Sequence, residues 1–227
     1  MKALILNGSP RGEKATSHAL GSLLADGLRL HGVEVDRAYA LGALHDEART
    51  SALLDAIDVA DLVVLAFPVY VDSLPAPLTR LLELVAARTV HRSTATPRCR
   101  RLAAIVQCGF PEAAQCDTAL AICRHFAGAA GFEWAGGVAL GEGGMLGGGL
   151  DRIPPKAAAR VRQALAISAE ALARGRQLPH AAADDLRRPL LRPSLYILAG
   201  NLGWRWDARR HRAKRPLSYR PYAERSI

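Results

Sequence analysis

Three short runs composed only of apolar residues constrain the fold of this chain more than any other sequence feature. The runs are ALIL at 3–6, LVVLAF at 62–67 and LAAIV at 102–106. Apolar runs of four to eight residues that end at turn residues are typical of strands buried on both faces, which occur in parallel sheets covered by helices. The first run ends at the turn sequence Asn7-Gly8-Ser9-Pro10. The chain is therefore predicted to be an α/β protein.

The segments between these runs supply helices and two further strands. Apolar residues at helical spacing predict helices near residues 16–31, 50–60, 78–85, 120–127 and 161–172. Alternating apolar and polar residues over 33–39 predict a strand near a sheet edge, and residues 138–140 form a weaker fifth strand. Strands separated by helices pair in parallel through right-handed crossovers. We expect a doubly wound five-stranded parallel sheet, and five strands favour the order 2-1-3-4-5.

Ligands of such sheets bind beyond the carboxyl ends of the strands, where the strand order reverses. The loops after residues 6, 67, 106 and 140 therefore form the candidate site. In the first loop, Ser9, Thr16 and Ser17 supply hydroxyl donors and Arg11 can contact two oxygens, beside the positive end of a helix. This composition fits a phosphate monoester, although it matches neither a P-loop nor the dinucleotide motif GxGxxG. The alternative is that the hydroxyls only cap the helix and Arg11 is solvated.

The other three loops offer flat or flexible surfaces. Pro68 stiffens the second loop, 67–77, and Tyr70 presents an aromatic face to a planar ring, unless this is an ordinary proline-rich turn with Tyr70 on the surface. In the third loop, Gly109 allows close approach of the backbone to a ligand and Phe110 could flank the same ring. The fourth loop, 141–149, contains six glycines and is either a lid or a long connection.

Together the four loops resemble a known family. The sequences NGSPR with Ser/Thr at the helix start, FPVYVDSLPAPL, CGFPE and a Gly-rich loop are similar to those of the flavodoxin-like NAD(P)H-dependent FMN reductases and oxidoreductases, over roughly residues 1–175. The resemblance implies a flavodoxin-like fold, the cofactors FMN and NAD(P)H, and a homodimer or higher homo-oligomer. One departure is Ala15-Thr16-Ser17, where the family often has Ser-Asn-Thr, and this change is expected to weaken FMN binding.

The resemblance also implies which residues bind FMN. The phosphate would be held by Ser9, Arg11 and Ser17, with Thr16 assisting. The isoalloxazine ring would be lined by Pro68, Val69, Tyr70 and Val71 on one side and contacted at its other edge by Gly109 and Phe110. No catalytic side chain is assigned, because hydride transfer is the chemistry of the cofactor. The implied activity is an oxidoreductase that passes hydride from NAD(P)H through FMN to a small acceptor such as a quinone, an azo or nitro compound, or free flavin.

Four cysteines, 99, 108, 116 and 123, are separated by 9, 8 and 7 positions, which are too widely spaced to indicate a zinc or iron-sulfur site. We therefore expect no bound metal. The sequence shows no signal peptide and no run of the roughly 20 apolar residues that span a bilayer. These features predict a cytoplasmic protein with reduced thiols.

The net charge of +9 resides in the C-terminal part of the chain. Residues 187–227 contain 11 Lys and Arg against two acidic residues, whereas residues 1–186 contain 19 of each sign. A uniformly basic nucleic-acid-binding domain is therefore disfavoured. We predict a flavodoxin-like FMN-binding domain at 1–178, followed by a linker and a basic helical C-terminal extension at 179–227.

Two questions remain open at the level of sequence. The alternative to an enzyme is a non-catalytic FMN-binding electron carrier or redox sensor, although such carriers are usually acidic and this domain is neutral. The basic extension, which contains Trp204 and Trp206, would either dock on the domain or on a second subunit, or make peripheral contact with a membrane.

Overall fold

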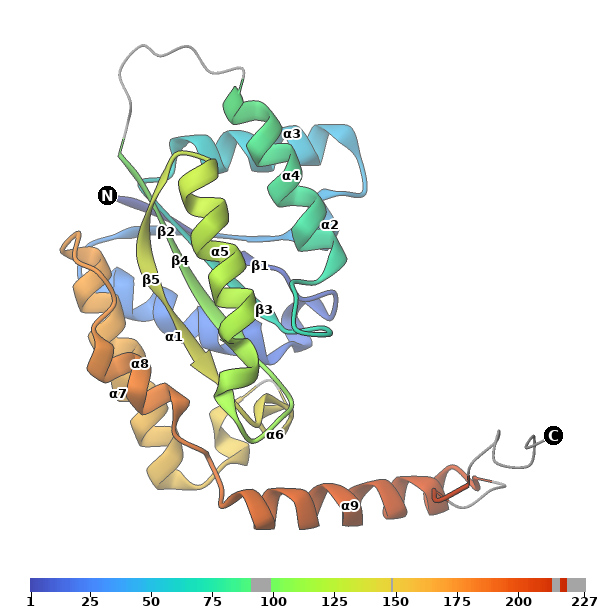
Figure 1. Cartoon of the computed structure of the whole chain (residues 1–227). Helices are drawn as coiled ribbons and strands as arrows, with labels where there is room; N and C mark the ends of the chain where they lie inside the picture. Colours follow the sequence, from blue (N-terminus) through green and yellow to red (C-terminus); the bar gives the residue numbers. More distant parts are fainter. Residues whose placement is uncertain (91–98, 148, 214–216, 220–227) are drawn as a thin grey trace. The chain divides into compact units, whose positions relative to one another are not determined.

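The computed structural model describes residues 1–90, 99–147, 149–213 and 217–219. Within these ranges the chain forms a five-stranded parallel sheet surrounded by helices (Figure 1). The strands are β1 (Lys2–Asn7), β2 (Glu34–Tyr39), β3 (Leu62–Pro68), β4 (Arg100–Gln107) and β5 (Phe132–Leu140). The longer helices are α1 (Thr16–Leu30), α3 (Glu47–Val59), α4 (Ala76–Val90), α5 (Asp117–Ala129), α7 (Pro155–Ala173), α8 (His180–Arg187) and α9 (Pro193–Arg210).

The strand order is β2-β1-β3-β4-β5, and every neighbouring pair is parallel. The predicted doubly wound sheet and its order are therefore confirmed. The fifth strand is longer than the sequence indicated, because it continues through Gly136 and Gly137. Glycine is favoured at Gly136, which has a φ of +110° and where a Cβ would lie 2.9 Å from Leu178 Cβ.

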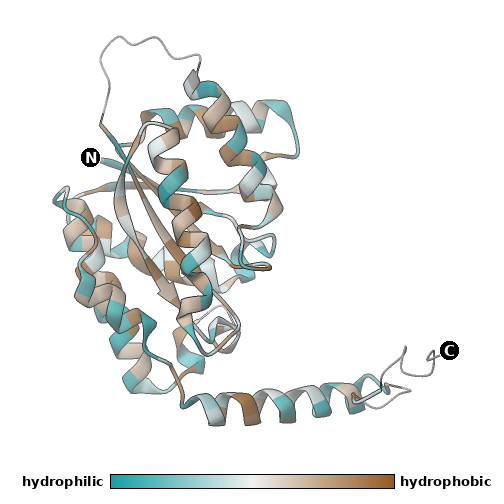
Figure 2. Ribbon diagram, in the orientation of Figure 1, coloured by the Kyte–Doolittle hydropathy of each residue, from teal (hydrophilic) through white to brown (hydrophobic). Residues whose placement is uncertain are grey.

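Alternate side chains of the central strands enter two separate cores, as the two-residue period of a strand requires. Ile5 of β1 packs with α1, α7 and α8 on one face, while its neighbours Leu4 and Leu6 pack with α3, α4 and α5 on the other. The central strands are accordingly among the most continuously hydrophobic segments of the ribbon (Figure 2). This two-sided burial explains why the sequence shows unbroken apolar runs rather than alternation.

Short helices complete the connections between these elements. They are the α-helical turns α2 (Ala40–Ala43) and α6 (Gly143–Leu146) and the 3-10 turns η1 (Gly12–Lys14), η2 (Ala113–Cys116) and η3 (Leu150–Arg152). The Gly-rich loop thus contains a helical turn at its start. Residue 148 of this loop lies outside the described residues.

The chain divides into two compact units, residues 1–190 and residues 191–227. The sequence predicts a domain boundary at residue 178. The first unit extends further because α8 adds Ala182 and Leu186 to the core beside α7, and Leu190 is buried there as well. The described part of the second unit consists mainly of α9, so the predicted extension is helical there; residues 214–216 and 220–227 lie outside the described residues.

Candidate functional site

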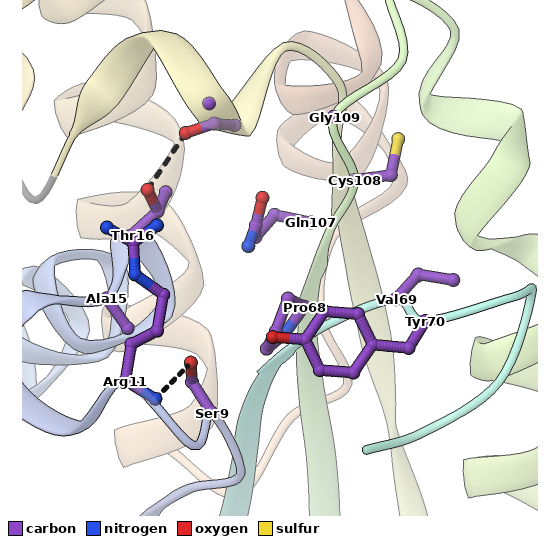
Figure 3. Close-up of a pocket in the computed structure, with 12 residues that line it drawn as sticks. Ser9, Arg11, Ala15, Thr16, Pro68, Val69, Tyr70, Gln107, Cys108 and Gly109 are labelled. Carbon is purple, nitrogen blue, oxygen red and sulfur yellow. Dashed lines mark hydrogen bonds between the residues drawn. The ribbon is translucent and has the colours of Figure 1, made fainter. Parts of the chain in front are cut away.

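A cavity of about 190 Å³ lies where the loops after β1, β3 and β4 meet the turn α6, at the carboxyl ends of the strands (Figure 3). Such a position is the expected ligand site of an open α/β sheet. Its lining consists of Ser9, Arg11, Ala15, Thr16, Pro68, Val69, Tyr70, Gln107, Cys108, Gly109, Gly143 and Gly144.

Asn7, the last residue of β1, shapes the first loop. Its Oδ1 atom accepts hydrogen bonds from the Ser9 amide at 2.8 Å and from the Ser17 hydroxyl at 3.2 Å. Its Nδ2 atom donates to the Gly12 carbonyl at 3.3 Å, and Gly12 has a φ of +58°, which favours glycine. One buried amide therefore fixes both ends of the loop.

The first loop directs positive charge toward the cavity. Helix α1 begins after Ala15, which caps it without any side-chain hydrogen bond. The first amides of a helix have no intrahelical partner, and they lie at the positive end of the helix dipole. Arg11 is exposed at the same place, and no carboxylate of the described residues forms an ion pair with its guanidinium. This wall of the cavity is therefore suited to an anion.

The second loop forms a flat wall. The Val69 amide donates to the Gln107 carbonyl at 2.9 Å, which continues the β3–β4 pairing past Pro68. Tyr70 and Ser73 then exchange two backbone hydrogen bonds around Val71 and Asp72, whose φ values are +50° and +58°. Figure 3 shows the Tyr70 ring beside Pro68 with its hydroxyl directed toward the first loop.

The turn after Tyr70 contains stored backbone strain. A β-branched residue rarely adopts a positive φ, and such a conformation costs of order 1–3 kcal/mol. Val71 is also 98% exposed, so packing of its own side chain within the first unit does not offset the cost of the positive φ. Strain of this kind is concentrated at functional loops.

Backbone hydrogen bonds join the third and fourth loops. The Glu142 amide donates to the Phe110 carbonyl at 2.7 Å, and the Gly143 amide donates to the Cys108 carbonyl at 2.8 Å. Gly143 packs closely against Gln107, because a Cβ there would lie 1.7 Å from the Gln107 Oε1 atom and would force that side chain to move. The start of the Gly-rich loop is therefore held by hydrogen bonds and close packing, and it forms one wall of the cavity.

The Thr16 hydroxyl links the first loop to this wall, since it donates to the Gly143 carbonyl at 2.8 Å. Its proton is thus engaged within the protein. Ser17 is fully buried, and its hydroxyl proton is used by Asn7. The backbone amides of these two residues, rather than their hydroxyl protons, face the end of the helix where an anion would bind.

The cysteine at the cavity has an unusual environment. A hydrogen bond from the Cys116 thiol lowers the pKa of Cys108 to about 7, against the effect of burial, which raises it. Both thiols belong to the core beneath the third loop, and the Cys108 Sγ atom lies 3.6 Å from the Glu112 carbonyl oxygen.

Burial raises the pKa of Cys123 to about 12. The described residues contain no group of His, Cys, Asp and Glu side chains that could hold a metal ion.

The structure brings most of the sequence-predicted binding residues to one cavity. Those that line it are Ser9, Arg11, Thr16, Pro68, Val69, Tyr70 and Gly109. The other three lie outside the lining: Ser17 is buried behind it, while Val71 and Phe110 are 98% and 60% exposed.

Sequence reasoning did not assign several lining residues, namely Ala15, Gln107, Cys108, Gly143 and Gly144. It also passed over Asn7. The sequence pattern does indicate Gln107 as a site residue, because Gln107 is a polar residue that directly follows an apolar strand. For Gly143 the sequence indicates only the Gly-rich loop, since the contact of Gly143 with Gln107 arises only when two loops 36 positions apart meet.

Comparisons with known proteins place this geometry in a family. A family model described as "Flavodoxin-like fold" matches residues 1–166. No curated protein matches the chain. A search of solved structures finds an FMN-dependent NADH-azoreductase from Bacillus anthracis in complex with FMN, at 14% identity and a TM-score of 0.54, which covers 76% of this chain and 99% of that chain.

Two further structures are similar. A protein described as a quinone reductase from Klebsiella pneumoniae has 17% identity and a TM-score of 0.55, with 76% of this chain and 85% of that chain covered. Rubredoxin oxygen:oxidoreductase from Desulfovibrio gigas has 16% identity and a TM-score of 0.54, with 82% of this chain but 37% of that chain covered. At these identities the structures establish the fold, and together with the family model they show that this chain belongs to the flavodoxin-like fold family.

Proposed function

We propose that the protein is an FMN-dependent NAD(P)H oxidoreductase that passes hydride from NAD(P)H through bound FMN to a small acceptor, such as a quinone, an azo or nitro compound, or free flavin. The observation that carries this proposal is the cavity at the carboxyl ends of β1, β3 and β4. It combines an anion-binding wall, formed by Arg11 and the start of α1, with a flat wall formed by Pro68 and Tyr70. A phosphate joined to a planar ring matches both walls.

The residues present fit FMN. Arg11 and the Ser9 hydroxyl would bind the phosphate together with the amides of Thr16 and Ser17. The Ser17 hydroxyl would act indirectly, by holding the Asn7 amide that shapes the loop. Gly143, Gly144 and Gln107 line the cavity together, and the Gln107 side chain occupies the space that a Cβ at Gly143 would need.

The ring would lie against Pro68, Val69 and Tyr70, with Gly109 at its other edge. FMN, when bound, supplies the hydride-accepting and hydride-donating ring, and the side chains orient the two reactants and limit the access of water. Backbone amides of the Gly109–Phe110 segment are suited to stabilise negative charge at the nearby ring edge. Tyr70 would position the ring rather than act as an acid or base.

We further propose that the working unit is a homodimer. The cavity volume is below the 300–1,000 Å³ that is usual for small-molecule sites. Around its mouth the apolar side chains of Val71 and Phe110 are largely exposed, and Tyr70 is 46% exposed. A second subunit that covered these side chains would enclose the ring and bury the strained turn. The cytoplasmic location expected from the sequence stays a prediction.

The test begins with the visible spectrum of the purified protein, before and after addition of FMN and then of NADPH or NADH. We expect flavin uptake, bleaching by the nicotinamide, and rapid turnover with a quinone. A protein that takes up no flavin would overturn the proposal. Bound flavin that is reduced only slowly, and only by a partner protein, would favour an electron carrier instead.

A matched pair of variants tests the phosphate site. Arg11→Gln removes a charge that lines the cavity, whereas Lys14→Gln removes the same charge from η1, outside the lining. Hydrogen bonds to charged groups contribute about 1.5–3 kcal/mol, so Arg11→Gln is expected to weaken FMN binding roughly ten- to hundredfold. Lys14→Gln is expected to change it less than threefold. Equal effects in a fluorescence titration would show that Arg11 does not contact the phosphate.

A further inference from the structure

Helix α9 exposes more large apolar side chains than any other element of the described chain. None of its residues is buried. Six large side chains are each between about one half and two thirds exposed, which is the opposite of their usual environment. They are Leu195, Ile197, Leu198, Leu202, Trp204 and Trp206.

The apolar residues of α9 form one main stripe. Leu195, Leu198, Leu202 and Trp206 follow each other at intervals of three or four residues, so they share one face of the helix. Trp204 lies on the other side, two residues from Trp206 and therefore about 200° around the axis, and Ile197, seven residues before Trp204, shares that side. The helix has 18 residues and is thus about 27 Å long.

The charge of the second unit is strongly positive. Residues 191–227 contain nine Lys and Arg against two acidic residues, whereas residues 1–190 contain 21 basic and 19 acidic residues. Arg209 and Arg210 end the helix, after Asp207 and Ala208, and the Arg210 guanidinium lies 5.4 Å from the centroid of the Trp206 ring. An apolar stripe that ends in tryptophan and arginine suits the boundary between acyl chains and phosphate groups.

We propose that α9 docks on the surface of an anionic phospholipid bilayer, with the Leu195–Trp206 stripe at the acyl boundary and the arginines at the lipid phosphates. The positive charge of the second unit favours an anionic bilayer over a second copy of the chain. A second copy of the chain would bring the same positive tail and a first unit whose net charge is also positive, at +2, whereas an anionic bilayer is negative over its whole surface. Contact with the bilayer would be peripheral, since no helix in the described part of the chain is long and apolar enough to cross a membrane.

The experiment is co-sedimentation of the full-length protein with vesicles of phosphatidylglycerol and phosphatidylcholine, compared with vesicles of phosphatidylcholine alone. We expect binding to the anionic vesicles that weakens as salt is added. Binding is measured without flavin or nicotinamide, so its failure and the failure of the proposed enzymatic function are distinguishable.

Two tryptophans on different sides of one helix provide a matched control. Trp206→Ala removes the stripe's largest side chain and is expected to weaken vesicle binding roughly tenfold or more. Trp204→Ala removes an equally exposed ring from the other side and is expected to have a much smaller effect. Circular dichroism of both variants checks that α9 is retained. Equal losses would overturn the stated orientation of the helix and, with it, the proposal.

The charge is tested in the same assay. Arg209→Gln should weaken binding about fivefold, because each basic residue near an anionic surface contributes about a fivefold gain in affinity. Arg124→Gln removes an equally exposed arginine from α5 in the first unit and should leave binding unchanged. Absence of binding to anionic vesicles overturns the proposal, as does binding that is the same on neutral vesicles. Conversion of a stable dimer into monomers by Trp206→Ala without any vesicle binding would instead assign the stripe to a second copy.

Discussion

Residues 1–190 and residues 191–227 use the same kinds of side chain in opposite ways. Leu186 of α8 is 2% exposed, whereas Leu202 of α9 is 55% exposed. Arg100 of β4 is buried, pairs with Asp58 at 3.2 Å and lies over the ring of Phe132, whereas Arg209 of α9 is exposed to solvent. The difference shows that an apolar pattern alone does not bury a helix. Burial requires a second apolar surface, which the sheet provides for α8.

The largest effect is expected from two truncations that bracket the boundary between the units. Deletion of 191–227 should leave the first unit folded with nearly unchanged stability. Deletion of 179–227 also removes α8, and burial of Leu186 and Leu190 alone corresponds to roughly 3–6 kcal/mol. That shorter chain is expected to be largely unfolded at 25 °C. Urea unfolding followed by circular dichroism measures both; similar stabilities would contradict the placement of α8 in the core.

A pair of leucine substitutions makes the same comparison within the full-length chain. Leu186→Ala leaves a cavity in the core and should cost about 2–5 kcal/mol of unfolding free energy. Leu202→Ala should change it by less than about 0.5 kcal/mol, because the side chain contacts mostly solvent. A large cost at Leu202 would mean that α9 is packed against protein in solution.

A pair of glycine substitutions has a smaller effect on stability but a sharper effect on the site. Gly143→Ala forces a Cβ against the Gln107 side chain, so we expect about 1–3 kcal/mol of destabilisation and weakened FMN binding. Gly203→Ala in α9 meets no atom within 4 Å and should instead increase helicity slightly, by up to about 1 kcal/mol in helix propensity. Thermal unfolding, flavin titration and circular dichroism are the measurements. Unchanged FMN binding by Gly143→Ala would place the ligand elsewhere.

The smallest expected effect is a pH dependence confined to the first unit. The pKa of Cys108 is about 7 in the folded chain and lies below its ordinary value, so between these values the unfolded state binds more protons. The contribution of Cys108 to stability should therefore be fully present above about pH 9 and should be lost as the pH falls from about 9 through 7. Cys108→Ser should flatten this slope in urea unfolding experiments, while the arginines of the second unit stay charged throughout. A slope that persists in the variant would assign it to another group.

The spacing of apolar residues predicted the strands and helices well, because each element packs on a core and therefore repeats its apolar residues with the period of a strand or of a helix. The apolar run at 62–67 is buried on both faces, and the spacing of Leu20, Leu24 and Leu28 matches the face of α1 that packs on the sheet. The sequence indicates a shorter β5, since Gly136 and Gly137 lower strand propensity, whereas the positive φ of Gly136 and its close neighbour Leu178 favour glycine within the strand. The sequence of α8 resembles a linker because its polar residues outnumber the few residues that reach the core.

The candidate site was predictable in location but not in detail. Strand ends mark the loops, so Ser9, Arg11, Tyr70 and Gly109 could be chosen from the sequence. The hydroxyl of Ser17, by contrast, faces Asn7 because Asn7 ends a strand at the point where helix α1 begins. The direction of a side chain depends on the hydrogen-bond partner that the fold brings next to it. That partner cannot be identified from the sequence.

By itself, the sequence determined the period of each element, and through it the doubly wound sheet, the edge where loops gather and the position of the excess positive charge. The tertiary structure alone decided which distant atoms meet: Gly143 with Gln107, Thr16 with the Gly143 carbonyl, and α8 with the core. The two kinds of feature differ in the separation along the chain over which the interactions act. Hydrophobic period and turn propensity act over a few residues, whereas close packing and hydrogen-bond partners are fixed only when segments far apart in the chain share one space.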